Sequence, residues 1–388
     1  MLDVIVIGGG PGGLATAHGL AASGRSVTVI EEHDAIGMPV HCTGVLAEEA
    51  IAALNLPAES VLNPLSTVKF VAPAGQSFEY TTATTEAVVI DRAVFDAMLA
   101  RRAELAGAVV SKGRRVTMIE PSVSTVRITL SDGETMVARA AVIACGANYT
   151  FQRRLGLGMP STFLHSAQLE LPADTPGDVE IHFGSEIAPK GFAWAVPVRR
   201  SYGTFARIGV MAEANASLYF SRMLARIRAS WAVAVPDTLT PRRRMLPLSG
   251  VRRSYADRVL AVGDAAGLVK PTTGGGIYYG IVSGQIAAEV LDTALATDDL
   301  SAQALREYER RWRARFQSEF KAQQALRFVA HRMRDADIDL LFDLAKTDGI
   351  LPIVRQTARF NQHRDFILAL LRHQPARRAL FGRLASSM

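Results

Sequence analysis

Residues 3–13 read Asp-Val-Ile-Val-Ile-Gly-Gly-Gly-Pro-Gly-Gly, and this stretch decides the fold. Asp3–Ile7 is a short, apolar, β-branched run, typical of a buried parallel strand. After the glycines, Leu14–Ser23 is rich in Ala and Leu and favours a helix. A second apolar run, Ser26–Ile30, is followed by Glu31. The order strand, glycine turn, helix, strand predicts one βαβ unit.

The spacing Gly8-x-Gly10-x-x-Gly13 indicates a dinucleotide site in this unit. Gly8 allows the tight turn, Gly10 lets the backbone approach a pyrophosphate, and Gly13 lets the helix pack close to the strand. The N-terminus of the helix offers N–H groups and a partial positive charge to phosphates. Glu31 can accept hydrogen bonds from ribose hydroxyls. A glycine loop without a ligand is the alternative interpretation.

A second glycine-rich segment lies late in the chain. The apolar run Val259–Val262 predicts a strand and leads into Gly263-Asp264, and glycines then precede Ile277. The chain therefore places an aspartate directly after a strand and a glycine turn before a helix. A simple helix cap is the alternative role of Asp264.

With Pro39–Gly44 and Gly191–Pro197, these segments resemble the geranylgeranyl reductase family of FAD-dependent oxidoreductases, which has the p-hydroxybenzoate hydroxylase fold. The resemblance covers roughly residues 1–290. It implies an enzyme that uses reduced FAD to saturate isolated double bonds of prenyl chains. The family pattern Tyr-x-Trp-x-Phe-Pro is changed at two positions here, since Phe192 and Val196 replace the Tyr and the Phe.

The resemblance also implies which residues contact FAD. Asp264 would bind the ribityl chain, and the helix that starts at Ile277 would point at the flavin pyrimidine. Val116 would contact the adenine through its backbone. Arg92 would reach the cofactor with its guanidinium, and the alternative is that Arg92 is an ordinary surface arginine. The implied contacts are Gly12, Glu31, Cys42, Thr43, Val45, Arg92, Val116, Asp264, Gly276 and Ile277.

Two residues are candidates for proton delivery. An isolated alkene needs a hydride at one carbon and a proton at the other, and a thiol or an imidazole beside the flavin is a plausible donor. By the family pattern, the loop with His41 and Cys42 passes near the flavin ring. We therefore expect Cys42, and secondarily His41, to be catalytic. The alternative is that Cys42 only packs beside the flavin.

Aromatic residues indicate the substrate side. Phe192 and Trp194 alternate along a predicted strand, so they face one side of a sheet. The resemblance implies that they line the prenyl-chain site together with Pro197, although core packing alone would also explain them. Cys145 stands where hydroxylases of this fold commonly have Asp-Gly, and we expect it to be a buried structural thiol.

The predicted fold is α/β. A discontinuous, Rossmann-like FAD-binding domain comprises residues 1–65, 85–160 and 250–296. Residues 66–84 and 161–249 form an antiparallel β-rich substrate domain, and residues 297–388 form a C-terminal helical region. β-Type runs at 109–118, 124–131 and 135–144 predict three strands in the first domain.

Composition excludes several classes. Two cysteines cannot build a disulfide framework or a four-ligand metal site, so no metal is expected, and a cytoplasmic location fits. The net charge is +6, and residues 301–388 hold 17 Lys or Arg against 9 Asp or Glu. A solvated helical face is the first explanation of this basic segment, and peripheral contact with anionic membrane lipids is the second. Nucleic acid is not an expected partner.

The expected partners are a prenyl-chain lipid or quinone and an external electron donor, either NADPH or ferredoxin. Two other functions stay open. A flavin monooxygenase or halogenase shares the fold, and Phe192–Pro197 half matches the halogenase Trp-x-Trp-x-Ile-Pro motif. Halogenation needs a well-placed lysine, and among the six lysines Lys69 is the candidate. An electron-transfer flavoprotein acting on a quinone is the other alternative.

Overall fold

The computed structural model describes residues 1–347 and 349–381. Their contacts divide the chain into two compact units. Unit 1 comprises residues 1–40, 92–162 and 247–318, and unit 2 comprises residues 41–91, 163–246 and 319–388. The boundaries differ from the predicted ones because residues 41–65 and 85–91 group with unit 2, and because the helical region divides at residue 318. The three-part functional division, whose last part includes residues outside those described, stays a prediction.

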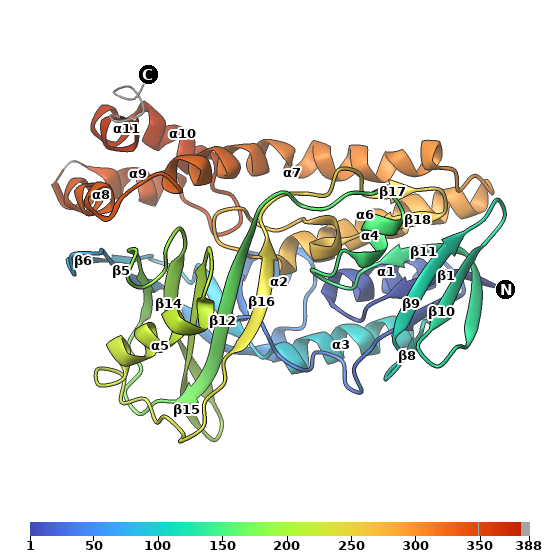
Figure 1. Ribbon diagram of the computed structural model, residues 1–388, viewed down its shortest axis with the longest axis horizontal. Helices are drawn as coiled ribbons and strands as arrows, with labels where there is room; N and C mark the ends of the chain where they lie inside the picture. The colour runs from blue at the N-terminus through green and yellow to red at the C-terminus, as the bar shows by residue number, and fades with distance from the viewer. Residues whose placement is uncertain (348, 382–388) are drawn as a thin grey trace. The chain divides into compact units, whose positions relative to one another are not determined.

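Unit 1 contains a largely parallel sheet (Figure 1). Its parallel strands lie side by side in the order β18-β11-β1-β2-β8. This is the doubly wound order, in which the chain leaves the central strand β1 in both directions. The strands are β1 (Leu2–Ile7), β2 (Val27–Ile30), β8 (Val109–Ser111), β11 (Thr135–Ile143) and β18 (Val259–Ala261). The predicted βαβ unit and Rossmann-like class are confirmed.

Antiparallel strands extend this sheet at one edge. β9 (Val116–Pro121) and β10 (Val126–Leu130) form a hairpin that pairs with the first half of β11. β17 (Tyr255–Ala256) pairs with β18. The prediction of one strand over residues 109–118 was wrong, because residues 109–111 belong to the parallel sheet and residues 116–121 to the hairpin.

The helices of unit 1 include two that run in parallel. α1 (Pro11–Ala22) and α6 (Ile277–Ala296) lie side by side (Figure 1). A Cβ on Gly12 would lie 3.0 Å from the Gly280 carbonyl oxygen, and one on Gly284 only 2.3 Å from the Gly12 carbonyl oxygen. One turn on, Thr16 Oγ1 donates to the Gly284 carbonyl at 3.1 Å. Contacts advance together along both helices, so both N-termini point to the same end.

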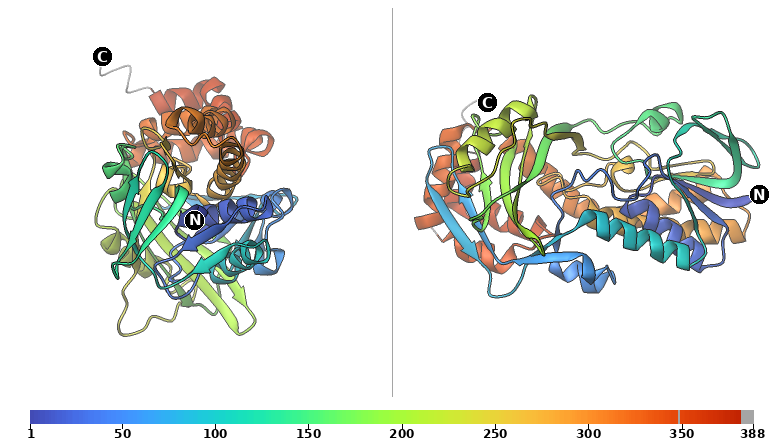
Figure 2. Two further views of the ribbon diagram at one scale, coloured as in Figure 1. Left: turned by 90° about the vertical axis from the view of Figure 1, so that its right-hand side faces the viewer. Right: turned by 90° about the horizontal axis from the view of Figure 1, so that it is seen from below.

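Unit 2 is built on a mainly antiparallel sheet, ordered β16-β12-β15-β14-β13-β5-β6 (Figure 2). β13 and β5 pair in parallel. The strands are β16 (Arg242–Pro247), β12 (Phe163–Pro172), β15 (Gly203–Ala212), β14 (Phe192–Arg200), β13 (Val179–His182), β5 (Thr67–Val71) and β6 (Ser77–Thr81). The predicted antiparallel, β-rich fold of this part of the chain is confirmed. A small sheet of β3 (Val45–Ala47), β7 (Ala87–Ile90) and β4 (Val61–Leu65) was not predicted.

One helix covers one face of the large sheet. α5 (Ala216–Ile227) packs its buried residues, such as Phe220 and Met223, on inward alanines and aliphatic residues of β12, β14 and β15. Ala193 and Ala195 belong to this core. Because side chains alternate along a strand, Phe192 and Trp194 lie on the opposite face.

The other helices are short or lie late in the chain. α7 (Ala302–Ala330) is the longest of them. Its residues up to Ser318 belong to unit 1, and those from Glu319 onward belong to unit 2. In the part of the chain that the structure describes, no helix is both long and apolar enough to cross a bilayer. The remaining helices are α2 (Glu48–Ala53), α3 (Arg92–Leu105), α4 (Thr150–Arg154), α7 (Ala302–Ala330), α8 (Asp335–Thr347), α9 (Ile350–Thr357), α10 (Arg364–Arg372) and α11 (Gln374–Phe381), with short 3-10 turns η1 (Ala58–Ser60) and η2 (Gly263–Ala266).

The close approach of α1 and α6 predicts the effect of one methyl group. In Gly284→Ala the new Cβ would overlap the Gly12 carbonyl, so the helices must separate, and we expect unfolding to become easier by about 1–3 kcal/mol. Gly280→Ala is the matched control, because its Cβ would meet nothing closer than 3.8 Å. Denaturant titration of both variants measures the difference, and equal stabilities would contradict the helix contact.

Candidate functional site

The carboxyl ends of the parallel strands in unit 1 bring predicted residues to one edge. Gly8 follows β1, Glu31 follows β2, Cys145 comes shortly after β11, and Asp264 comes shortly after β18. The edge includes the point between β1 and β11 where the chain reverses its direction of winding, and doubly wound folds bind ligands there. Gly8, Glu31, Cys145 and Asp264 therefore lie at one edge of the sheet.

Two glycines of the first turn are sterically required. Gly8 has φ +111°, and a Cβ there would lie 2.4 Å from the Ala144 carbonyl oxygen. A Cβ on Gly13 would lie 2.2 Å from the Gly8 carbonyl oxygen. The predicted turn and the predicted close packing of helix on strand are therefore confirmed.

Both parallel helices present their N-termini without a side-chain cap. Gly10 is the N-cap of α1, and a Cβ added there would meet no atom within 4 Å in the part of the chain that the structure describes. Gly276 is the N-cap of α6, and Ile277 is its first residue. Uncapped N–H groups at two parallel helix ends favour anionic groups such as phosphates.

The Glu31 carboxylate is held by the backbone around it. One oxygen accepts the Gly9 N–H at 2.8 Å, and the other accepts the His33 N–H at 3.0 Å and contacts His33 Nδ1. A carboxylate offers about four lone-pair positions, so acceptor capacity remains for a ribose hydroxyl. These bonds fix the orientation of Glu31.

Asp264 lies half-buried at this edge. Among residues 1–347 and 349–381, no donor makes a hydrogen bond to its carboxylate, and burial raises its pKa despite the opposing charge of Arg92. A Cβ on Gly276 would lie 2.6 Å from the carboxylate, so any larger residue there would displace the Asp264 side chain. A buried carboxyl group without a partner is costly unless a ligand supplies one. The helix-cap alternative finds no hydrogen bond to support it.

Arg92 begins α3 and is not a surface residue. Its side chain is only 14% exposed and donates to Asp96 at 2.7 and 3.2 Å. Burial still raises the pKa of Asp96, and the negative charge of Glu31 adds to that effect. Val116 begins β9, where it is buried and pairs with Leu130.

Unit 2 contains the other predicted residues. Phe192 and Trp194 lie on the face of the large sheet opposite α5, whereas Pro197, in register with Ala206 of the core under α5, lies on the other face, so the expectation that all three share one side was wrong. The ring centroids of Phe192 and Trp194 lie 5.8 Å apart, which confirms their common side. Trp194 is in register with Gly209 of β15, and Gly209 is in register with Gln168 of β12. A Cβ on Gly209 would lie 2.2 Å from the indole, so the Trp194 ring lies flat across this strand. Pro197 follows on β14 and accepts a hydrogen bond from Asn63 at its carbonyl.

The loop that precedes β3 is bound to this same face. Thr43 Oγ1 donates to Gln168 Oε1 at 2.8 Å, which joins the loop to the row that contains Trp194. Cys42 Sγ accepts the Gly44 N–H at 3.3 Å, and Val45 begins β3 opposite Val89. His41 has buried ring nitrogens. Unit 2 thus brings the Cys42 loop and the aromatic residues to one sheet face.

Sequence analysis missed the charged residues beneath this loop. Arg207 donates to the Thr43 carbonyl at 2.7 Å and to Glu170 at 2.6 Å, and Arg200 donates to Glu170 at 2.7 Å and to Asp91. The hydrogen bonds and charges of both arginines hold the pKa of Glu170 below its usual value, although burial opposes them. The signal in the sequence is weak: Glu170 is the single acidic residue of β12, and Arg207 is the single charged residue of β15.

Cys145 is half-buried at this edge of the sheet, and its role as a structural thiol stays a prediction. Its sulfur contacts the Asn148 carbonyl at 3.5 Å, and burial raises its pKa to about 12. A thiol with so high a pKa is a poor nucleophile at neutral pH.

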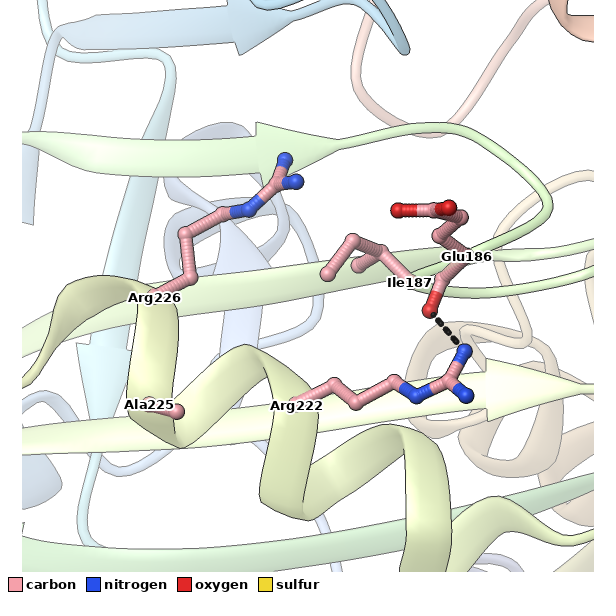
Figure 3. A pocket seen from close by; sticks show the side chains of 5 residues that line it. All are labelled: Glu186, Ile187, Arg222, Ala225 and Arg226. Carbon is pink, nitrogen blue, oxygen red and sulfur yellow. Dashed lines mark hydrogen bonds between the residues drawn. The ribbon is translucent and has the colours of Figure 1, made fainter.

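A hollow of about 430 Å³ lies elsewhere in unit 2, between α5 and the turn after β13 (Figure 3). Arg222 donates to the Glu186 carbonyl at 2.9 Å, and the Arg226 guanidinium extends beside Ile187. Ile187 belongs to the core under α5. The hollow therefore lies on the α5 side of the sheet and takes no part in the face with Trp194.

The residues present fit FAD on two observations from unit 1. The backbone at Gly10 faces open space beside two uncapped helix N-termini, which suits a pyrophosphate. The unpartnered Asp264 carboxylate suits the hydroxyls of a ribityl chain.

Comparisons with known proteins agree with this geometry. The family model named lycopene cyclase protein matches residues 3–346. Digeranylgeranylglycerophospholipid reductase 2 of Methanopyrus kandleri is 31% identical over 371 residues, which cover 91% of this chain and 92% of that protein.

Solved structures share the fold. A geranylgeranyl bacteriochlorophyll reductase-like protein of Thermoplasma acidophilum superposes with a TM-score of 0.83 at 22% identity, covering 100% of this chain and 99% of that one. A mutant of the halogenase PltM in complex with FAD gives a TM-score of 0.65 at 15% identity, covering 98% and 85%. The FAD-binding fold is therefore shown.

The lowered pKa of Glu170 predicts an acid-sensitive contribution to stability. A carboxyl group whose pKa is lower in the folded state stabilises fully above its unfolded value of 4.5, and this contribution is lost as pH falls through the folded pKa. We therefore expect Glu170→Gln to be less stable than wild type at pH 7, with the difference shrinking below about pH 4.5. Urea unfolding at several pH values measures this, and a constant difference would contradict it.

Proposed function

The chain belongs to the geranylgeranyl reductase family of FAD-dependent oxidoreductases, within the wider lycopene cyclase protein family, and from this we propose that it reduces C=C double bonds of prenyl chains. The main support is that the relationship extends along nine-tenths of the chain, and so through both units. The name of the reductase relative suggests a lipid with geranylgeranyl chains as the substrate.

In this proposal unit 1 holds the FAD. The N-termini of α1 and α6 face its anionic groups, Glu31 accepts ribose hydroxyls, and Asp264 accepts hydroxyls of the ribityl chain. Arg92 and the Val116 backbone are further contacts. Reduced FAD supplies the hydride that an isolated alkene requires.

Unit 2 would supply the proton and the wall of the substrate site. Cys42 is the first candidate donor, with His41 as the second, and the bond from Gly44 N–H fixes the direction of the Cys42 sulfur. Thr43 and Val45 complete the loop. Phe192 and Trp194 offer an apolar surface to a long chain, whereas Pro197 lies on the other face of the sheet. An isolated alkene has no carbonyl to hold charge, so positioning supplies most of the acceleration.

The halogenase alternative meets a specific difficulty. Lys69 pairs with Glu180 at 3.7 Å, and Glu180 is in register with Ala195 of the core under α5. Lys69 therefore lies on the face of the sheet opposite Trp194. A lysine there would not reach a substrate held against Trp194.

An anaerobic half-reaction tests the proposal. The protein is reduced with dithionite, freed of excess reductant, and mixed with a digeranylgeranylglycerophospholipid or with menaquinone. We expect flavin reoxidation together with a gain of two hydrogens for each saturated bond, followed by mass spectrometry. Cys42→Ser should keep its flavin and slow this step by about 10²-fold or more, the range of a lost proton donor.

Two other outcomes would contradict it. Reduction of the quinone ring with intact chains would favour electron transfer to quinone. A flavin that stays reduced until air is admitted, and then forms an oxygen adduct, would favour an oxygenase or halogenase.

Titration of the oxidised protein with NADPH or with reduced ferredoxin, again without oxygen, identifies the physiological donor, and we expect one of the two to reduce the flavin.

We also propose that the enzyme is cytoplasmic and contacts membranes through its basic C-terminal helices. Most of the apolar side chains of α10, such as Phe366 and Leu370, are only half-buried within unit 2, and arginines flank them at Arg364 and Arg372. This pattern is typical of helices that lie on anionic bilayers.

Vesicle sedimentation tests the membrane contact. We expect the protein to sediment with vesicles that contain phosphatidylglycerol and to be released by salt, because the attraction is electrostatic. Arg364→Gln with Arg372→Gln should weaken binding. Equal binding of this variant, or no binding to anionic vesicles, would contradict the proposal.

A further inference from the structure

The buried guanidinium of Arg207 makes contacts that a purely structural ion pair would not need. Arg207 lies on β15, on the face with Trp194, and is only 2% exposed. Its Nη1 donates both to the Thr43 carbonyl at 2.7 Å and to the Ile90 carbonyl at 2.9 Å. One nitrogen thus ties the Cys42 loop to the end of β7.

A chain of charges fixes the direction of this guanidinium. Arg207 Nε donates to Glu170 at 2.6 Å, the other Glu170 oxygen accepts from Arg200 at 2.7 Å, and Arg200 also pairs with Asp91. Burying such a network contributes little net stability, because desolvation of the charges offsets their attraction. What it does provide is a defined geometry, since the planar guanidinium can satisfy its partners in only one orientation.

The loop has a second anchor on the same sheet face. Gln168 is only 8% exposed, and its Oε1 accepts the Thr43 hydroxyl. The Gly44 carbonyl accepts the Ile90 N–H at 2.8 Å, and the Gly44 N–H donates to Cys42 Sγ. The sulfur is therefore positioned through Thr43 and Gly44. Gln168 and Arg207, which hold Thr43, lie close to Trp194 in the register of the large sheet, and Ile90 of β7 holds Gly44.

We propose that Arg207 is a positioning residue that holds the Cys42 thiol in register with the aromatic face of the sheet, with Gln168 as the second anchor. The consequence for catalysis rests on the proposed function, in which Cys42 delivers a proton. The positioning itself does not, since the contacts lie wholly within unit 2.

Alkylation of Cys42 measures the positioning directly. The purified protein reacts with excess iodoacetamide at pH 8, and peptide mass mapping follows each cysteine. Cys145 serves as an internal reference, because its pKa of about 12 leaves it largely protonated while the fold is intact. In Arg207→Lys we expect Cys42 to react about tenfold faster. The loop must open for the thiol to react, and loss of one hydrogen bond from a charged donor makes opening easier by about this factor.

Matched variants separate positioning from folding. Arg199→Lys makes the same change at an exposed arginine of β14 and should leave the Cys42 rate unchanged. Rapid labelling of Cys145 would reveal that Arg207→Lys unfolds. In that case Gln168→Leu tests the proposal instead, because it removes the second anchor without leaving a buried charge. If Arg207→Lys is folded, an unchanged rate of Cys42 alkylation would overturn the proposal. If Arg207→Lys unfolds, an unchanged rate in Gln168→Leu would overturn it.

Turnover gives an independent readout. If the wild type reduces prenyl chains, Arg207→Lys should lower kcat with little change in KM or flavin content, because the thiol and not the binding surface is displaced. A change confined to KM would overturn the positioning role. If the wild type reduces no prenyl chain, the proposed function fails, whereas the alkylation rates still decide the inference.

Discussion

The close crossing of α1 and α6 is the constraint on which unit 1 depends. Gly12 and Gly284 let the two backbones approach until helix oxygens and glycine carbons are in contact. Because the helices are parallel, both dipoles place their positive ends at the carboxyl edge of the sheet. Glu31 and Asp264 reach the same edge from the strands on either side. Steric fit between two helices thereby creates the electrostatic environment of a dinucleotide site.

Unit 2 uses a different physical device. One face of its large sheet packs on α5 through alanine and aliphatic side chains, and the other face combines aromatic rings with buried charges. The charges hold a loop, and the rings offer an apolar surface. A reductase of isolated alkenes needs both, because it has to exclude water from an apolar chain and still deliver a proton at a defined place.

The sequence predicted the features that depend on local geometry. Gly8, Gly13 and the residues at the strand ends were identified because turn and helix-start geometry restricts which residues fit. Contacts between distant residues left no such signal. Arg207 lies 164 positions from Thr43, and nothing in its own strand indicates that partner. The β-branched residues at 109–110 and 116–117 likewise predict extended backbone and cannot specify that the two pieces pair with different strands.

Binding of the flavin itself tests the central claim most directly. The apoprotein, titrated with FAD and separately with FMN, can be followed by quenching of flavin fluorescence. Because the proposed roles of the α1 N-terminus and Glu31 are to bind the pyrophosphate and the adenosine ribose, which FMN lacks, we predict saturable binding of one FAD per chain and much weaker binding of FMN. Equal affinity for both flavins, or failure to bind FAD, would contradict it.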